Sequence, residues 1–218
     1  MKVEFKCRII SKPVDYGRML KIQENKREEV ISGKSYGTVF FLEHNPVYTL
    51  GLRGSTLHFI EKFNVPVYRV KRGGEVTWHG PGQLIVYPVI NIKHTGFYSV
   101  RDFVQYFGNI IADVMVQDYG LKKAEWIDKK AGVWIEDRKI AFSGLHFRKF
   151  VPTHGFSINV SSDTVAYKKI IPCGIKSLKV TSMELEGNRV YNTVDVAEKI
   201  ILRIKRRFSK MQTVRKDI

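Results

Sequence analysis

Apolar positions between residues 99 and 120 recur at helical spacing. The stripe runs from Phe103 to Met115 and would cover one face of a helix. Ser99 in front of the stripe fits an N-cap, and Gly120 behind it fits a C-terminal stop. The pattern therefore predicts a helix between these two residues.

Two more helices are predicted nearer the ends of the chain. Asp15 can cap a first helix that runs to about Ile31 and is closed by Gly33. A last helix is predicted over about residues 194–210. Its apolar positions are four residues apart: Val196, Ile200, Ile204 and Phe208.

Runs of β-branched, aliphatic and aromatic residues between the helices predict strands. The runs are residues 38–42, 84–90, 156–160 and, more weakly, 65–70, with a hairpin formed by residues 132–135 and 139–142. Pro88 predicts that the second run is an edge strand or contains a bulge. One α+β domain over residues 1–218, with helices packed on a mixed or largely antiparallel sheet, accounts for this order.

The segment 72–83, RGGEVTWHGPGQ, interrupts this pattern with four glycines and a proline. Glycine reaches backbone conformations closed to other residues and lets a ligand approach the main chain. The spacing matches neither the phosphate-binding loop of nucleotide hydrolases nor the dinucleotide fingerprint. We therefore expect a loop that places backbone and polar groups against a ligand of another kind.

The charge of the chain predicts an acidic partner. Thirty-seven Lys and Arg residues against twenty-one Asp and Glu give a net charge of +16, and both nucleic acid and acidic proteins would be attracted. No RNA-recognition signature or zinc-finger spacing is present. The basic residues are dispersed apart from a concentration at 203–216, which we interpret as a solvated helix face.

The compartment is predicted from what the sequence does not contain. It has no run long enough for a transmembrane helix and no apolar core of a secretory signal near its start. The two cysteines do not form a disulfide framework. We expect a reduced, cytoplasmic protein.

Cys173 is the strongest candidate for covalent chemistry. It lies between Pro172 and Gly174, which predicts a turn and a sulfur that faces a cleft. A thiol reacts as the thiolate and needs a nearby cation or base at neutral pH, so from these residues alone a buried structural cysteine remains an alternative. Cys7, in a predicted strand, is interpreted as structural. The six histidines show no metal-ligand spacing, and no metal site is predicted.

The glycine-rich segment, residues 72–84, resembles the signature loop of lipoyl(octanoyl) transferases. Further short segments match the family in the same order: 44–51, 132–135, 139–141, 153–155, 159–160, 171–175 and 180–182. Each segment is weak alone, but the ordered set is specific and covers roughly residues 35–185. Enzymes of this family move an octanoyl group from acyl carrier protein to a lysine of a lipoyl domain, in lipoate biosynthesis.

The resemblance implies a fold like the catalytic domain of biotin and lipoate protein ligases, with no cofactor or metal. It implies that Cys173 is the acyl nucleophile and that Lys139 tunes the thiol and relays protons. It also implies a set of substrate-binding residues: Arg72, Gly73, Gly74, Glu75, Val76, Thr77, Trp78, His79, Phe142, Ser143, Gly144, Gly155, Phe156 and Ser157. The implied partners are octanoyl-acyl carrier protein as donor and lipoyl-domain proteins as acceptor, with neither nucleic acid nor a membrane span.

The chain departs from the family pattern in the segments expected to contact the acyl chain. Phe142-Ser143 and Phe156-Ser157 stand where smaller or aliphatic residues are usual, and Trp78 replaces a tyrosine. These changes bear on acyl-chain length more than on reaction type. Two alternatives remain at this point: an ATP-dependent lipoate–protein ligase of the same fold, and a basic nucleic-acid-binding module.

Overall fold

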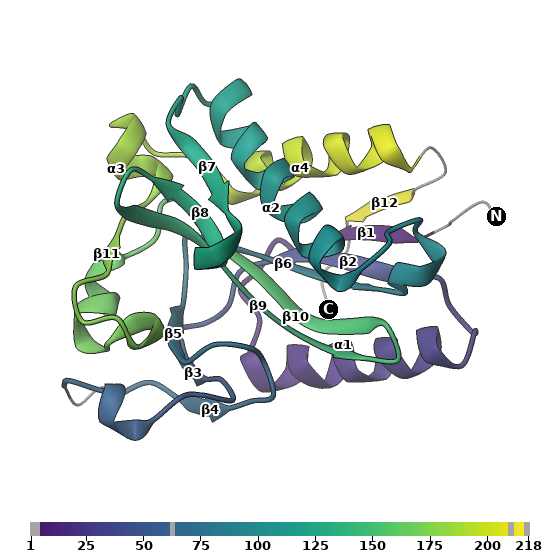
Figure 1. Cartoon of the computed structure of the whole chain (residues 1–218), viewed down its shortest axis with the longest axis horizontal. Helices are drawn as coiled ribbons and strands as arrows, with labels where there is room; N and C mark the ends of the chain where they lie inside the picture. The colour runs from purple at the N-terminus through teal and green to yellow at the C-terminus, as the bar shows by residue number, and fades with distance from the viewer. Residues whose placement is uncertain (1–4, 62–63, 209–211, 216–218) are drawn as a thin grey trace.

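A nine-stranded mixed sheet forms the centre of the molecule (Figure 1). The computed structural model describes residues 5–61, 64–208 and 212–215. The strand order is β12-β1-β2-β6-β10-β9-β8-β7, with β11 paired to β9. The strands are β1 (Lys6–Ile9), β2 (Gly37–Leu42), β6 (Gln83–Ile90), β7 (Ala124–Ile127), β8 (Gly132–Ile135), β9 (Arg138–Arg148), β10 (Val151–Asn159), β11 (Lys179–Val180) and β12 (Gln212–Arg215).

The sheet is antiparallel except where β1 pairs with β2 and β12, and where β11 pairs with β9. Helices α2 (Val100–Gln117) and α4 (Thr193–Arg207) cover one face, and α1 (Tyr16–Ile31) covers the other (Figure 1). A short helix, α3 (Met183–Gly187), follows β11. Each face of the sheet has its own hydrophobic cluster against its helices. The predicted α+β class with a mixed sheet is confirmed.

The helix boundaries are set by the side chains that the sequence indicated. The Asp15 carboxylate accepts a hydrogen bond from the Arg18 backbone N–H, and Ser99 accepts one from Asp102 N–H at 3.1 Å. These bonds satisfy amide groups that have no partner within the first turn. Gly33 and Gly120 follow the first two long helices with positive φ. The last helix ends at Arg207, and the expected end at Lys210 lies outside the described residues.

The edge strand expected from Pro88 was wrong, because β6 is a central strand between β2 and β10, and its pairing with β2 runs through Pro88 without a bulge. The ladder to β10 pairs only Gln83–Val86, whereas the ladder to β2 continues to Ile90. Pro88 therefore lies beyond the end of the ladder to β10, where a missing N–H is tolerated.

The glycine-rich segment is only partly a loop. Its middle part forms β5 (Val76–His79), which pairs with β3 (Val47–Leu50) in a small three-stranded sheet completed by β4 (Val67–Arg69). Pairing with a distant strand, Thr49 opposite Thr77, gives these four residues an extended conformation that local glycine content did not predict.

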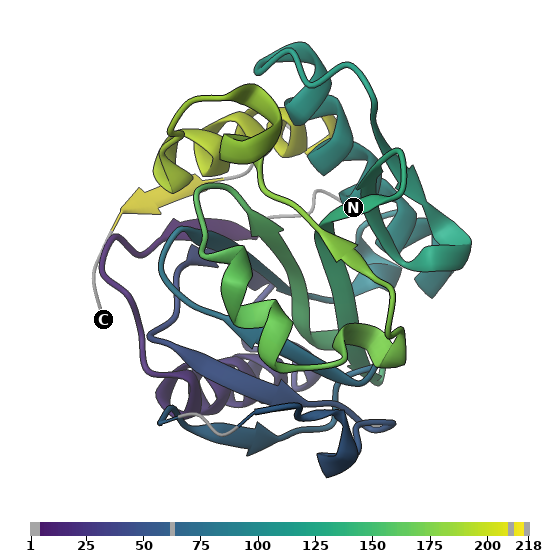
Figure 2. The ribbon, with the colours of Figure 1, turned by 90° about the vertical axis from the view of Figure 1, so that its left-hand side faces the viewer.

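Five short 3-10 helices connect these elements within the described residues. They are η1 (Thr56–His58), η2 (Ile92–His94), η3 (Asp128–Lys130), η4 (Thr164–Lys169) and η5 (Pro172–Gly174). Figure 2 looks onto η4 and η5, with the small sheet below them. Within the described residues, no helix combines the length and apolarity needed to cross a membrane.

Candidate active site

Cys173 lies on the strained turn η5 at the surface of the small sheet. Its φ and ψ of 56° and 19° are left-handed, and Gly174 after it also has a positive φ. The turn is held in place because Ile171 N–H donates to the His58 carbonyl at 2.7 Å. A left-handed conformation in a residue with a Cβ costs free energy, and such residues cluster at functional sites. The thiol is half-buried and reaches a cavity.

Lys139 comes to the same point from β9. The Lys139 Nζ lies 4.0 Å from the Cys173 Sγ and donates a hydrogen bond to the Lys130 carbonyl at 3.0 Å. Its ammonium also lies 4.9 Å from the centroid of the Phe142 ring. Burial of this side chain, which is 4% exposed, lowers the pKa of Lys139, and the charge of Cys173 opposes that shift.

Arg72 braces the first half of the glycine-rich segment. Its guanidinium donates to the Thr49 carbonyl at 2.7 Å and to the Thr49 hydroxyl, to the Glu75 carbonyl at 2.7 Å and to the Gly73 carbonyl at 2.9 Å. Burial lowers the pKa of Arg72. The buried Arg72 guanidinium thus ties the loop to β3 and fixes the backbone conformation of residues 73–75.

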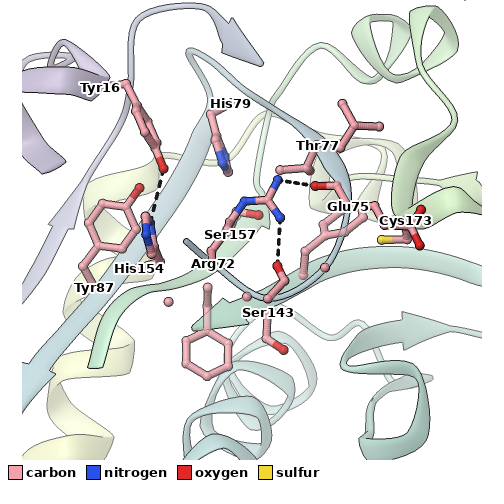
Figure 3. Close-up of a pocket in the computed structure, with 17 residues that line it drawn as sticks. Tyr16, Arg72, Glu75, Thr77, His79, Tyr87, Ser143, His154, Ser157 and Cys173 are labelled. Atoms are coloured by element: carbon pink, nitrogen blue, oxygen red, sulfur yellow. Dashed lines mark hydrogen bonds between the residues drawn. The ribbon is translucent and has the colours of Figure 1, made fainter. Parts of the chain in front are cut away.

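A cavity of about 480 Å³, including the part open to solvent, runs from Cys173 along this segment. Most of its accessible surface is apolar. Cys173 and Glu75 lie at one end, and Tyr16, Tyr87 and His154 lie at the other (Figure 3). Of the substrate-binding residues implied by the family resemblance, all except Trp78 line this cavity.

Two aromatic residues of that set contribute to the surroundings of the cavity. The Trp78 ring packs against Tyr48, with centroids 5.0 Å apart, because alternation along β5 turns it away from its neighbours Thr77 and His79. The Phe156 ring, 2% exposed, stacks on Phe107 in the main core. The backbone of Phe156 can line the cavity while its ring fills the core.

The far end of the cavity is polar but uncharged. The Tyr16 hydroxyl and His154 Nδ1 lie 3.3 Å apart, and the His44 Nε2 lies 2.9 Å from the Tyr87 hydroxyl. Burial lowers the pKa of His154 to about 3 and that of His44 to about 4. His79, hydrogen-bonded to Gln83, also has its pKa lowered by burial. These imidazoles are neutral at neutral pH.

Sequence reasoning did not assign Tyr16, Tyr87 or His154 to the site. His154 lies in a segment that matched the family, and its positive φ of 59° is unusual for a non-glycine residue. Tyr16 begins the first helix, 138 residues away from His154 in the chain, and no local signal marks it. Among the described residues, no group of three His, Cys, Asp or Glu side chains could hold a metal ion.

Comparison with known proteins identifies the class first. Residues 15–205 match the lipoyl protein ligase A/B catalytic domain. A putative lipoate protein ligase from T. acidophilum, solved with bound lipoic acid, superposes with a TM-score of 0.69 at 15% identity, over 99% of this chain and 89% of that one. Biotin protein ligase from Aquifex aeolicus superposes with a TM-score of 0.52 at 14% identity, over 96% and 71% of the two chains. These structures establish the shared ligase-type fold.

Sequence similarity then narrows the class. An octanoyltransferase from Paenarthrobacter aurescens is 40% identical over 86% of this chain and 85% of its own length. Another, from Clostridium kluyveri, is 36% identical over 87% and 82%. The chain belongs to the octanoyltransferase family, and it is an acyltransferase of protein lipoylation.

Proposed function

We propose that this protein transfers an octanoyl group from octanoyl-acyl carrier protein to a lysine of a lipoyl domain, through a thioester on Cys173. The observation that carries the proposal is the 4.0 Å separation of the Lys139 Nζ and the Cys173 Sγ at the end of an apolar cavity. A nucleophile beside a cation, next to an apolar wall that a hydrocarbon chain can contact, is what an acyl-enzyme requires.

In the first step the Cys173 thiolate attacks the carbonyl carbon of the donor thioester. The ammonium of Lys139 stabilises the thiolate, because an opposite charge at this distance in a poorly solvated site favours the ionised form. The bond between the carbonyl carbon and the donor sulfur breaks. The departing thiolate takes a proton from Lys139, and octanoyl-Cys173 remains.

In the second step the amine of the acceptor lysine attacks octanoyl-Cys173. Neutral Lys139 accepts a proton from the attacking amine, and the Cys173 thiolate leaves as the amide forms. The lowered pKa of Lys139 supports this role, because it reduces the cost of passing between the charged and neutral forms.

The cavity accounts for the acyl group. Its apolar surface can hold a hydrocarbon chain that starts at Cys173 and runs beside Arg72 towards Tyr16 (Figure 3). The neutral imidazoles at the far end place no charge against that chain. Residues 72–77, His79, 142–144 and 155–157 form its walls, while Arg72 works mainly as a brace for them.

Mass spectrometry of the intact protein tests this proposal. Wild-type protein mixed with octanoyl-acyl carrier protein, without ATP, is expected to gain the mass of one octanoyl group on Cys173. Cys173→Ser should gain none and should lose transfer to the lipoyl domain. Cys7 is a matched internal control because it is fully buried, and burial raises its pKa. Full transfer activity in Cys173→Ser, or a requirement for ATP, would show the mechanism to be wrong.

A further inference from the structure

A second cavity meets the first at Cys173. Including the part open to solvent, it has a volume of about 1540 Å³, against about 480 Å³ for the first. The two cavities share residues 73–75, residues 143–144 and Cys173 in their walls, so they meet at the same cysteine. Lys139 lines only the second.

The walls of the second cavity are largely apolar. Val100 and Val104 come from the first turns of α2, Leu145 and Phe147 from β9, and Leu178 from the segment before β11. Val100 is 38% exposed, so part of this apolar wall faces solvent. An elongated ligand that carries methylene and methyl groups between its polar groups can lie against such a surface.

The charges at this cavity are unbalanced. Arg53, Lys129 and Lys130 line it, are exposed, and pair with no carboxylate in the described part of the chain. The Lys130 ammonium lies 4.8 Å from the centroid of the Trp134 ring. Three free cations along one cavity attract an anion.

The two acidic residues that line the cavity, Glu75 and Asp137, offset these cations only in part. The Asp137 carboxylate is 2.6 Å from the Lys179 Nζ and 3.7 Å from Arg138. The Glu75 carboxylate lies 3.4 Å from His58, which carries a charge only when it is protonated, so Glu75 balances one of the cations. The net charge presented to a ligand is therefore positive.

We infer that the second cavity holds the phosphopantetheine arm of the donor during acylation, with its phosphate at Arg53, Lys129 and Lys130. The inference rests on the proposed function. When the acyl chain occupies the first cavity, the pantetheine side of the donor thioester needs a different path away from Cys173. The first cavity does not provide it, because Tyr16, Tyr87 and His154 lie at its far end. The second cavity is lined both by Cys173 and by three cations that have no carboxylate partner among the described residues.

The arm also places the leaving sulfur beside the proton donor. As the Cys173 thioester forms and the donor carbon–sulfur bond breaks, the released pantetheine thiolate lies in the cavity that Lys139 lines. It takes its proton from the Lys139 ammonium and leaves as a thiol. The second cavity then becomes free for the acceptor lysine.

Two small donors that differ only by the phosphate test the inference. The rate of Cys173 acylation per unit donor concentration is measured for octanoyl-phosphopantetheine and for octanoyl-pantetheine. In wild-type protein the phosphate is expected to raise this rate about ten-fold, the size of a charge-assisted contact. In Lys129→Gln, Lys130→Gln and Arg53→Gln the ratio of the two rates should fall towards one.

Lys176→Gln is the matched control. It removes the same charge from the exposed loop after Cys173, but Lys176 does not line the cavity. Its ratio should stay at the wild-type value. An equal fall in Lys176→Gln would assign the effect to net charge and overturn the inference.

The remaining outcomes separate the inference from the proposed function. If octanoyl-acyl carrier protein fails to acylate Cys173, the proposed function itself is wrong. If it acylates Cys173 but the phosphate gives no advantage, or neither small donor reacts, only the inference is overturned. It is also overturned if the three variants leave the ratio unchanged and instead raise the KM for the lipoyl domain in the second step.

Discussion

Lys139 lies in a buried place that disfavours the charged form of its amine. It is 4% exposed, and its Nζ has two oriented partners, the Lys130 carbonyl and the Cys173 sulfur. Desolvation favours the neutral amine, whereas the thiolate favours the ammonium. A lysine balanced between these effects can lose and regain a proton during a reaction.

Removing the Lys139 amine should make Cys173 less reactive at neutral pH. In Lys139→Ala, and in Lys139→Met, which keeps the volume, alkylation by iodoacetamide should reach half its maximal rate at a higher pH than in wild type. The thiolate loses its neighbouring cation in both variants. Lys176→Met, which removes a charge outside the cavity, should keep the wild-type profile. An unchanged profile in Lys139→Met would remove Lys139 from the proposed mechanism.

The lowered pKa of His154, at the far end of the cavity, makes the stability of the fold depend on pH. Its pKa is about 3 in the folded protein against 6.5 in a free side chain, because burial disfavours the imidazolium. Between about pH 3 and 6.5, His154 is protonated in the unfolded chain and neutral in the folded protein. Stability therefore rises with pH through this window and is lost as the pH falls below about 6.5.

Replacing His154 should weaken this dependence. In His154→Asn, which retains a residue type tolerant of positive φ, the slope of unfolding free energy against pH should fall by up to about 1.4 kcal/mol per pH unit. Urea unfolding at several pH values between 4 and 6.5 measures it. His94→Asn, at an exposed position, should leave the slope unchanged. A wild-type slope in His154→Asn would mean that His154 accepts a proton in the folded state.

At the scale of elements, the β8–β9 hairpin sets the position of Lys139. Gly132 opens β8 and pairs with Phe142 on β9. A Cβ at Gly132 would overlap the Cε of Lys139 and the Ala141 carbonyl. Because Gly132 has no side chain, the Lys139 side chain has the space it needs to extend to Cys173.

Gly132→Ala should therefore reduce activity by displacing the amine. We expect a kcat at least ten-fold lower, with a shift of the alkylation profile in the direction expected for Lys139→Met. Gly33→Ala is the control: it also strains the backbone, at a φ of 76°, but lies at the end of α1 with open space around it. It should lower stability by about 1 kcal/mol and leave kcat unchanged. Normal kcat in a folded Gly132→Ala would show that Lys139 tolerates displacement.

At the scale of the whole molecule, the net charge of +16 has a definite use in the proposed function. Acyl carrier proteins are acidic, and a basic surface speeds their encounter with the enzyme. Some of the basic residues have local roles instead. The Arg203 guanidinium lies 2.5 Å from the Asp118 carboxylate, and Arg207 covers the Phe97 ring at 4.3 Å. The basic C-terminal helix is thus partly tied to the fold.

The salt dependence of kcat/KM should distinguish long-range electrostatic attraction of the donor from the chemical steps at Cys173. Screening shortens the reach of charge from about 10 Å at 0.1 M to about 3 Å at 1 M ionic strength. The kcat/KM for octanoyl-acyl carrier protein should therefore fall several-fold over this range. The value for uncharged octanoyl-pantetheine should change little, which controls for effects of salt on the active site. Equal loss for both donors would exclude a role for the net charge in donor capture.

Elements that local rules specify were predicted well. The caps Asp15 and Ser99, the apolar stripe of α2 and the hairpin at 136–138 depend on residues close in sequence, so their pattern contains the information. Elements made by long-range pairing were missed or misplaced. β5 within the glycine-rich segment and the central position of β6 depend on partners far away in the chain.

The same division holds for the site. The sequence by itself determined the family, the turn around Cys173 and the glycine-rich segment, because these are contiguous motifs. Only the tertiary structure brought Lys139 within 4.0 Å of Cys173, added Tyr16 and His154 to the far end of the cavity, and turned Trp78 away from it. Distances between side chains on different elements follow from strand register and packing, which no local pattern encodes.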